Sequence, residues 1–478
     1  MKKAISILLA LAMVLALAAC GVTDTASSAP AASSGGQSAA TPAPAAQSGS
    51  SDTAPAPADE APAASAAAAS ISLWTYPIGG WGDQEQVKVL TDAFTAETGI
   101  NVTVEYLTYQ DGDDKINTAI AAGQAPDLVM EGPERLVAGW GANGKMVNLA
   151  DLFTVEDMAE INPAVSTACF ALAGDEIVAY EFPLVMTAHC MGINVRAFEE
   201  AGALQYVDLE SHTWTTENFF KAVQALYDYY GDTVAAVFCG GQGGDQGTRA
   251  LVTNLHGGSF ADVMHTSYTW DDPANIQALT ELRNQSGIYF DPSIVGGDEI
   301  ANFYNGIFKM AFCWNIAQQL NPNNAGTGAA KNVNGDDIAF MAFPSEDGTA
   351  ELQGGIWGFG IFDNGDAARI EAAKKFIVFM ADSEHTVDAV RTANYFAVRS
   401  SIHGQDISDI WADNEIMQEY NVLMQYLGDY YQVTSGWTQA RTSWWNMLQQ
   451  VGASDGSEEA VTAAVSQYCS EANAAAAG

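Results

Sequence analysis

A strand, a helix and a second strand follow one another over residues 71–106, and this succession constrains the fold most. The strand expected at 71–74 leads through a glycine-rich turn to Asp83, a typical first residue before a helix. Apolar residues then recur at helical spacing until Gly99, and residues 100–106 alternate between apolar and polar. A strand–helix–strand unit pairs its strands in parallel through a right-handed crossover. The sequence therefore predicts an α/β fold.

The same alternation continues along the chain. A second helix is expected at 114–122 and a strand at 127–130, and another amphipathic helix at 371–380. The last 30 or so residues also have a helical pattern, and no solenoid repeat is present. Open α/β sheets bind ligands beyond the carboxyl ends of their strands, so we expect a ligand site at such an edge.

The charge of the chain excludes several classes of partner. It has 478 residues, with 18 Lys and Arg against 58 Asp and Glu, a formal net charge of −40. No basic surface exists to neutralise phosphates, so DNA and RNA are excluded as partners. The length predicts two to three domains or one large two-lobed body.

The N-terminus has the features of an export signal. Lys2 and Lys3 precede an apolar run at 4–18, which is too short for a lasting membrane span. The sequence LAACG that ends in Cys20 and Gly21 resembles the bacterial lipobox, which implies cleavage after residue 19 and lipid attachment to Cys20. Residues 20–70 are rich in Ala, Ser and Pro and are expected to be a disordered linker. We therefore expect a protein anchored by lipid to the extracytoplasmic face of the cell membrane.

No pattern in the sequence indicates catalysis, a cofactor or a metal. The five cysteines after Cys20 form no C-x-x-C pair, so buried free thiols are expected, although one disulfide stays open. Residues 452–456 match G-x-S-x-G, but they lie between two expected helices instead of after a strand, so we interpret them as a turn. No metal site, no cofactor and no enzymatic activity are predicted.

Aromatic residues are placed at expected strand ends and loops. Any one of these rings could equally be packed in the core, but together they suggest a cleft with flat apolar faces beside polar groups. Such a cleft suits sugars, whose C–H faces stack on rings while their hydroxyls need paired donors and acceptors. The rings that stand out are Trp74, Tyr76, Trp81, Trp314, Trp357, Trp437, Trp444 and Trp445.

Several motifs resemble those of the extracellular solute-binding proteins of bacterial ABC importers, the family that includes maltose- and oligosaccharide-binding proteins. The resemblance extends over about residues 71–478. It is carried by an L-x-x-x-F-x-x-x-x-G-I-x-V pattern at 90–102 and by the segment from Lys115 to the Pro-Asp-Leu at 126–128. The segments 303–310 and 354–376 resemble further motifs of the family.

The resemblance implies a two-lobed periplasmic-binding-protein-like α/β fold with crossing hinge segments. Lobe 1 is expected at 71–183 and 355–405, and lobe 2 at 184–354 and 406–478. It further implies a monomer that holds a carbohydrate, expected to be an oligosaccharide, between its lobes and delivers it to the transmembrane subunits of an ABC permease.

The resemblance also implies site residues. After the strand at 127–130, maltose-binding relatives use an aromatic, an acid and an arginine, where this chain has Glu131, Glu134 and Arg135. Trp314 is expected to provide a stacking ring at the end of its strand. The complete set of expected substrate contacts is Tyr76, Trp81, Tyr109, Glu131, Glu134, Arg135, Asp245, Trp314, Trp357, Trp437 and Trp444.

Two alternatives remain open at this point. The same scaffold could bind a cationic ligand such as a polyamine, if Glu131, Glu134 and Asp245 converge. A surface glycosidase would instead need two carboxylates about 5–9.5 Å apart across a scissile bond.

Overall fold

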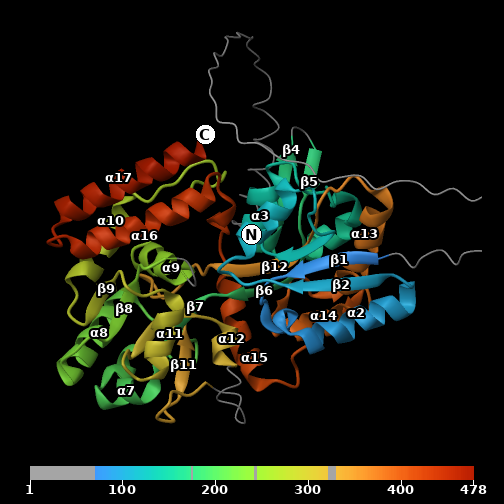
Figure 1. Ribbon diagram of the computed structural model, residues 1–478. Helices are drawn as coiled ribbons and strands as arrows, with labels where there is room; N and C mark the ends of the chain where they lie inside the picture. The colour runs from blue at the N-terminus through green and yellow to red at the C-terminus, as the bar shows by residue number, and fades with distance from the viewer. Residues whose placement is uncertain (1–69, 174–175, 242–244, 321–329, 478) are drawn as a thin grey trace, which may run out of the picture. The chain divides into compact units, whose positions relative to one another are not determined.

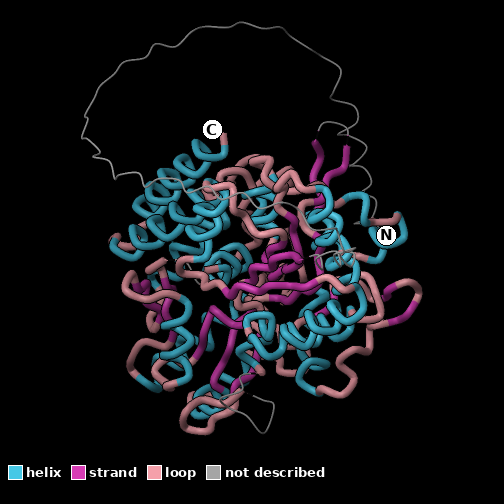
Figure 2. The backbone as a smooth tube through the Cα atoms, turned by 45° about the vertical axis from the view of Figure 1, so that its right-hand side comes forward, coloured by secondary structure: helices cyan, strands magenta, loops and turns pink. Residues whose placement is uncertain are grey.

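Two β-sheets organise the structure, a computed structural model in which helices surround the strands (Figure 1, Figure 2). It describes residues 70–173, 176–241, 245–320 and 330–477, which belong to one compact unit. The expected signal peptide, Cys20 and the linker up to residue 69 lie outside the described residues.

The first sheet contains the predicted βαβ unit. Strands β1 (Ser70–Thr75) and β2 (Asn101–Tyr106) pair in parallel, and α2 (Gln84–Thr98) connects them. The Asp83 carboxylate accepts hydrogen bonds from the backbone N–H groups of residues 85 and 86, and Gly99 ends the helix in the left-handed conformation at φ 71°. The predicted beginning and end of this helix are confirmed.

This sheet has six strands in the order β13-β6-β12-β3-β1-β2. The strand β12 runs antiparallel to both of its neighbours, so the sheet is mixed. We call the part of the chain built on this sheet lobe 1. Its other strands are β3 (Leu128–Glu131), β6 (Phe182–Ala188), β12 (Gly354–Ile361) and β13 (Phe396–Ala397), with the hairpins β4 (Phe170–Ala173)–β5 (Glu176–Ala179) and β14 (Ser401–Ile402)–β15 (Gln405–Asp406) beside it.

Helices of lobe 1 cover the sheet. Phe94 of α2 packs edge-on against Phe376 and Phe379 of α13, with ring centroids 5.1 and 5.4 Å apart. These contacts join two helices that are far apart in the sequence over one apolar layer. The helices are α3 (Gly112–Ala121), α4 (Pro133–Arg135), the π-helical turn η2 (Leu136–Gly141), α5 (Val155–Glu160), α6 (Pro163–Cys169), α13 (Ala367–Ala381) and α14 (Thr386–Ala393).

The second sheet, β10-β7-β11, is antiparallel, and with the parallel pair β8–β9 it forms the centre of lobe 2. The strands are β7 (Cys190–Asn194), β8 (Ala235–Phe238), β9 (Ile288–Asp291), β10 (Met310–Trp314) and β11 (Ile338–Met341). The helices are α7 (Val195–Glu200), α8 (Thr216–Tyr230), α9 (Gln246–Leu255), α10 (Pro273–Asn284), α11 (Gly296–Tyr304) and α12 (Ile316–Gln319).

The C-terminal part returns to lobe 2. After α15 (Glu415–Tyr420), η6 (Asn421–Tyr426) and η7 (Tyr431–Val433), the helices α16 (Trp437–Ala453) and α17 (Glu458–Ala476) lie side by side next to α10 (Figure 1). The G-x-S-x-G sequence at 452–456 forms the turn between α16 and α17, as predicted. A nucleophile elbow is thereby excluded at this position.

The first passage of the chain from one sheet to the other takes a single residue. Strand β6 remains in the first sheet up to Ala188, and β7 begins in the second sheet at Cys190, so only His189 separates them. The change of sheet therefore lies five residues beyond the expected boundary at 183/184. Extended backbone continues through the crossing, which is why the sequence pattern carries no break there. The return into β12 begins at Gly354, one residue from the expected boundary.

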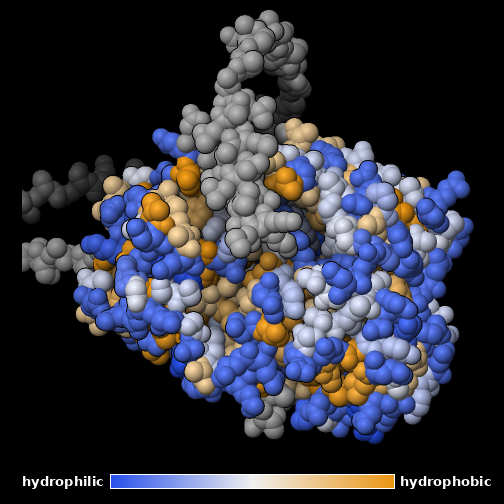
Figure 3. Space-filling model, turned by 180° about the vertical axis from the view of Figure 1, so that it is seen from behind, coloured by the Kyte–Doolittle hydropathy of each residue, from blue (hydrophilic) through white to orange (hydrophobic). Residues whose placement is uncertain are grey.

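Apolar side chains fill the interior, and the face shown in Figure 3 is mostly hydrophilic, with smaller hydrophobic patches. All five cysteines after Cys20 are free thiols, and all but Cys313 are fully buried. Across the described ranges, no helix combines the length and apolar character needed to cross a bilayer.

Candidate functional site

Arg135 lies at the centre of the acidic residues that follow β3. Its guanidinium donates to the carboxylates of Glu131 (Nη1–Oε1 2.7 Å), Glu134 (Nη1–Oε1 3.2 Å) and Asp113 (Nε–Oδ1 2.7 Å). Only 12% of its side chain is exposed. Burial alone would lower its pKa, but the three carboxylates raise it well above the ordinary value, so Arg135 is always charged.

The local backbone explains how these residues come together. β3 ends at Glu131, and Gly132 connects it to α4, whose first residue is Pro133. A Cβ atom on Gly132 would lie 2.7 Å from the backbone oxygen of Ile356 in the neighbouring strand, so only glycine fits this close approach. The immediate turn into α4 keeps Glu131, Glu134 and Arg135 at the carboxyl end of the sheet.

Two tyrosine rings lie against Arg135. Tyr76 and Tyr109 stack with their centroids 5.2 Å apart, and the guanidinium carbon lies 5.3 and 5.8 Å from the two ring centroids. Tyr76 is buried, and its hydroxyl donates to Asp113, whereas Tyr109 keeps 42% of its surface exposed. We name these residues, Tyr76, Tyr109, Asp113, Glu131, Glu134 and Arg135, the Arg135 cluster.

Glu131 is the most deeply buried acid of the Arg135 cluster. It is 1% exposed, and its Oε2 atom has no hydrogen-bond partner within the described chain. Burial raises the pKa of Glu131 to about 8; Arg135 opposes this change, and the negative charges of Glu134 and Asp113 add to it. Burial and these two acids therefore favour the protonated form of Glu131 when no ligand is bound.

Asp245 occupies a second charged centre, in lobe 2. Its carboxylate accepts from Arg249 of α9 and from Arg441 of α16, with Arg441 Nε 2.9 Å from Oδ2. Burial alone would raise the pKa of Asp245, but the two arginines outweigh it and hold the pKa well below its usual range. The Arg249 guanidinium also lies 4.9 Å from the ring centroid of Trp437. With Tyr431, these residues form what we call the Asp245 cluster.

Two successive tyrosines connect the clusters. The Tyr430 hydroxyl donates to Glu134 Oε2 at 2.7 Å, and the Tyr431 hydroxyl accepts from Arg249 Nε at 3.0 Å. The positive charge of Arg441 also lowers the pKa of Glu131, which places the two clusters within electrostatic reach of each other. Residues from both lobes therefore meet around the segment 430–431.

Trp357 is connected to the Arg135 cluster through Tyr395. Its half-buried ring stacks on Tyr395 at 4.7 Å with an interplanar angle of 21°, and Tyr395 is close enough to influence the pKa of Tyr109. The predicted residues Tyr76, Tyr109, Glu131, Glu134, Arg135 and Trp357 thus come together, and Asp245 and Trp437 lie in the neighbouring Asp245 cluster.

Three predicted tryptophans do not face a ligand cleft. Trp81, Trp314 and Trp444 are 0%, 1% and 1% exposed. Each indole N–H already has a partner inside the protein: the Ala389 oxygen, Gln319 Oε1 and Thr248 Oγ1, respectively. The predicted placement of these rings is wrong because the core takes up their whole apolar surface. Position at a strand end does not determine which side of the strand a ring packs on.

Several residues of the site were missed from the sequence. Asp113 comes directly before the helix expected at 114–122, and no motif marks it as a site residue. Arg249 and Arg441 belong to a chain that has only 18 basic residues, so their rarity was an available signal. The adjacent pair at 430–431 offered no motif.

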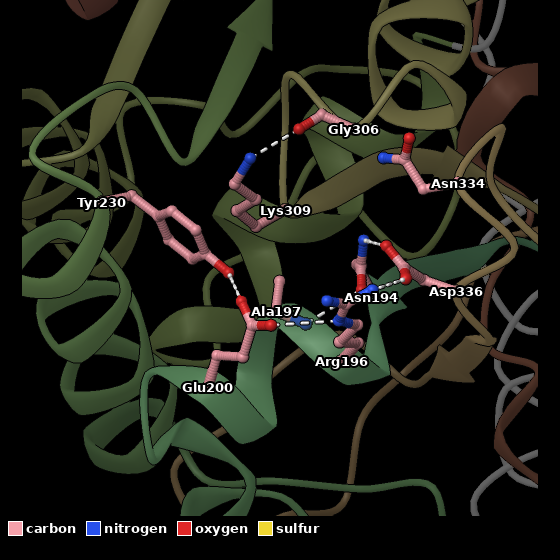
Figure 4. A pocket seen from close by; sticks show the side chains of 9 residues that line it. All are labelled: Asn194, Arg196, Ala197, Glu200, Tyr230, Gly306, Lys309, Asn334 and Asp336. Atoms are coloured by element: carbon pink, nitrogen blue, oxygen red, sulfur yellow. Dashed lines mark hydrogen bonds and ion pairs between the residues drawn. The ribbon is translucent and has the colours of Figure 1, made fainter.

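A separate cavity of about 370 Å³ lies in lobe 2 and contains none of the predicted residues (Figure 4). Its charged side chains and its tyrosine have partners: Arg196 pairs with Glu200 and Asp336, the Tyr230 hydroxyl with Glu200, and the Lys309 ammonium with the backbone oxygen of Gly306. In the described part of the chain, no three His, Cys, Asp or Glu side chains are arranged to hold a metal ion. The two connected clusters are therefore the candidate site.

Solved structures share this fold. The GacH receptor of Streptomyces glaucescens, known with acarbose, aligns with a TM-score of 0.64 at 15% identity, over 84% of this chain and 97% of its own. The cyclic α-maltosyl-1,6-maltose binding protein of Arthrobacter globiformis has a TM-score of 0.64 at 15% identity, over 84% and 98%. The maltotriose binding protein of Thermus thermophilus has a TM-score of 0.61 at 15% identity, over 85% and 99%. At such identities the likeness shows the two-lobed fold.

Sequence comparison identifies the family. No curated protein sequence matches the chain. The family model described as bacterial extracellular solute-binding protein matches residues 90–419, well over half of the chain. That segment includes the Arg135 cluster except Tyr76, both sheets apart from β1, and the crossing at His189. With the predicted motifs, the two-sheet architecture and the family match in agreement, the chain belongs to the bacterial extracellular solute-binding proteins.

Proposed function

We propose that the protein captures a carbohydrate between its two lobes and delivers it to the permease of an ABC importer, without chemical turnover. The observation that carries this proposal is the Arg135 cluster, where stacked tyrosine rings lie beside carboxylates and an arginine. Rings can cover the C–H faces of a sugar while the charged groups pair with its hydroxyls. Structural relatives named for acarbose, maltotriose and cyclic maltosyl-maltose support this choice.

The lobes suit capture by closure. Glu134 belongs to lobe 1 and Arg249 to lobe 2, and the two reach neighbouring tyrosines. A ligand that contacts both clusters would bind the closed arrangement more tightly than an open one. Such differential affinity is what shifts a conformational equilibrium toward closure.

A thermal-shift screen of the full-length chain against neutral saccharides, including maltotriose and cellotriose, tests the proposal. A saccharide present at 100 times its Kd should stabilise the protein by about 2.7 kcal/mol. Tyr109→Ala should remove the shift without lowering the melting temperature of the free protein, because the Tyr109 ring is 42% exposed. If no carbohydrate raises the midpoint, the proposed function is wrong. Cleavage of the oligosaccharides in the same mixtures would indicate a glycosidase.

We further propose that Cys20 carries a lipid that holds the protein on the extracytoplasmic face of the membrane. The LAACG sequence and the Ala-, Ser- and Pro-rich segment after it support this proposal. Cys20→Ala should abolish labelling by a fatty-acid analogue while leaving ligand affinity unchanged. Membrane retention of the Cys20→Ala protein at the parental level would exclude a lipid anchor at this residue.

A further inference from the structure

Two buried acids of lobe 1 have carboxylate oxygens without donors. In Glu131, Oε1 accepts from Arg135 at 2.7 Å, while the buried Oε2 has no partner in the described structure. Glu181 is 0% exposed, and among the described residues its two oxygens have no hydrogen-bond partner apart from the weakly donating thiol of Cys169 beside it. A buried carboxylate that lacks donors is costly, so its presence calls for an explanation.

The two acids belong to the same face of the sheet. Glu131 pairs with Gly358 of β12, and the next pair along β12, Met130 with Phe359, points to the opposite face. Phe182 also pairs with Phe359, so the strand alternation, continued one residue before β6 begins, puts Glu181 on the side of Glu131. The charges of Glu134 and Glu131 raise the pKa of Glu181, and all three acids raise the pKa of Tyr430, so they lie within electrostatic reach of one another.

Acidic groups outnumber basic ones at this place. Arg135 is paired with Asp113, Glu131 and Glu134, and Glu181 adds a fourth acid. The positive charge of Arg441 also reaches Glu131, but the Arg441 guanidinium is bound to Asp245. A neutral sugar would offer hydroxyl donors but nothing to favour the ionised form of these buried acids, whereas a cation would supply both donors and compensating charge.

We propose that the carbohydrate is an aminated one, whose ammonium group binds the unpartnered oxygen of Glu131, with Glu181 and Glu134 supplying further negative charge. The inference rests on the proposed function and specifies its ligand as a saccharide with a free basic amine. An ammonium donates three hydrogen bonds and forms charge-assisted contacts with carboxylates. A bound metal ion is a weaker explanation, since the described residues form no group suited to hold one.

Isothermal titration of the full-length chain with three matched trisaccharides tests this inference. The β-1,4-linked trimers of glucose, glucosamine and N-acetylglucosamine share a backbone and differ at the second carbon of each ring. The glucosamine trimer should bind at least about tenfold more tightly than the other two, as a charge-assisted contact requires. Equal or weaker binding of the glucosamine trimer would overturn the inference.

Two further ligands separate this inference from the proposed function. If maltotriose binds and no glucosamine trimer does, the amine inference fails while carbohydrate binding stands. If spermidine binds and no saccharide of either kind does, both the inference and the proposed function fail. If none of the five ligands binds, the amine inference and the proposed function both fail.

Substitutions of Glu131 and Glu134 test whether these acids cause the preference for the glucosamine trimer. Glu131→Gln should reduce affinity for the glucosamine trimer about tenfold more than it reduces any affinity for the glucose trimer. Glu134→Gln provides a second test if the Glu131 variant does not fold. Asp336→Asn is the matched control, because it removes one negative charge from the separate lobe-2 cavity of Figure 4. A preference that survives both glutamate variants, or is lost equally in the Asp336 control, would contradict the assignment.

Discussion

Trp314, the last residue of β10, has almost no exposed surface. Its ring meets Phe303 edge-on at 5.3 Å, and its N–H donates to Gln319 at 2.9 Å. Trp314→Ala would leave a large cavity and an unpaired Gln319 oxygen, so unfolding should become easier by roughly 3–5 kcal/mol. Denaturant titration measures this change.

Trp357→Ala is the informative comparison for Trp314. The Trp357 ring is only half-buried and stacks on Tyr395 beside the Arg135 cluster. Its removal should weaken saccharide binding more than it lowers stability. If Trp314→Ala is as stable as the parent protein but binds saccharide more weakly, Trp314 stacks on the ligand and does not stabilise the core.

Glu299 makes stability depend on pH. Its buried carboxylate accepts from the backbone N–H groups of Phe312 (2.7 Å) and Cys313 (2.8 Å), yet burial raises its pKa to about 8. Between pH 4.5 and 8 the folded state holds a proton that the unfolded state has released. The contribution of Glu299 is therefore complete below pH 4.5 and falls as pH rises toward 8, by about 1.4 kcal/mol per pH unit.

Urea unfolding at pH 5, 6 and 7 checks this sign. The parent should lose stability more steeply with rising pH than Glu299→Gln, because the variant lacks the titrating group. Glu131 and Glu181 have raised pKa values and change in the same direction, so the difference between the two slopes is the quantity to compare. Identical slopes would show that Glu299 is ionised throughout this range.

At the scale of elements, α9 packs closely against β10 because Gly247 has no side chain. A Cβ atom on Gly247 would lie 1.9 Å from the backbone oxygen of Phe312, which no rotamer can relieve. Gly247→Ala should push the first turn of α9 outward and displace Arg249 with it. We expect a loss of about 1–3 kcal/mol in stability and a loss of saccharide binding.

Gly231→Ala serves as the control for Gly247→Ala. Gly231 ends α8 at φ 67°, and no atom lies within 4 Å of the position that an added methyl group would take, so only the left-handed backbone is penalised. It should cost about 1 kcal/mol and leave binding intact. If both variants bind equally well, the packing of α9 on β10 does not position the Asp245 cluster.

The sequence predicts helices and strands better than it predicts whether a single aromatic ring packs in the core or faces a cleft. The βαβ unit, the helix ends at Asp83 and Gly99 and the turn at 452–456 follow local rules, because capping and periodicity depend on neighbours in sequence. The strand preceding Trp314 was also predicted, but the burial of Trp314 depends on Phe303 and Gln319 in other elements. Contacts of this kind are absent from any local pattern.

The same distinction holds for the candidate site. Glu131, Glu134 and Arg135 are close in sequence, and Arg135 forms ion pairs with both acids. Their partners Asp113 and Tyr430 come from distant segments, and no local pattern indicates that those segments lie beside β3. Tertiary packing alone assembles the complete set.

At the scale of the whole molecule, the net charge of −40 should influence ligand capture. A negatively charged protein attracts a cationic saccharide over a distance that salt controls, about 30 Å at 0.01 M and 8 Å at 0.15 M ionic strength. If the ligand is aminated, the association rate constant of the glucosamine trimer should fall severalfold across this range. Stopped-flow fluorescence of the intrinsic tryptophans measures the rate.

The glucose trimer, which is neutral, provides the reference for the effect of salt on the association rate constant. Its association rate constant should be unaffected, because a neutral ligand gains nothing from the long-range field. A salt-independent rate for the glucosamine trimer would mean that the local pairing around Arg135 cancels the field of the surface acids at the entrance to the site.

The adjacent tyrosines at 430–431 also limit how far the lobes can separate before contacts are lost. Their Cα atoms are held about 3.8 Å apart by one peptide unit, yet one hydroxyl contacts Glu134 of lobe 1 and the other Arg249 of lobe 2. Widening the gap between those partners must break at least one bond. The pair therefore fixes the spacing of the two lobes while both hydrogen bonds are made. The surface presented to a permease has one geometry in that state and a different geometry after either bond breaks.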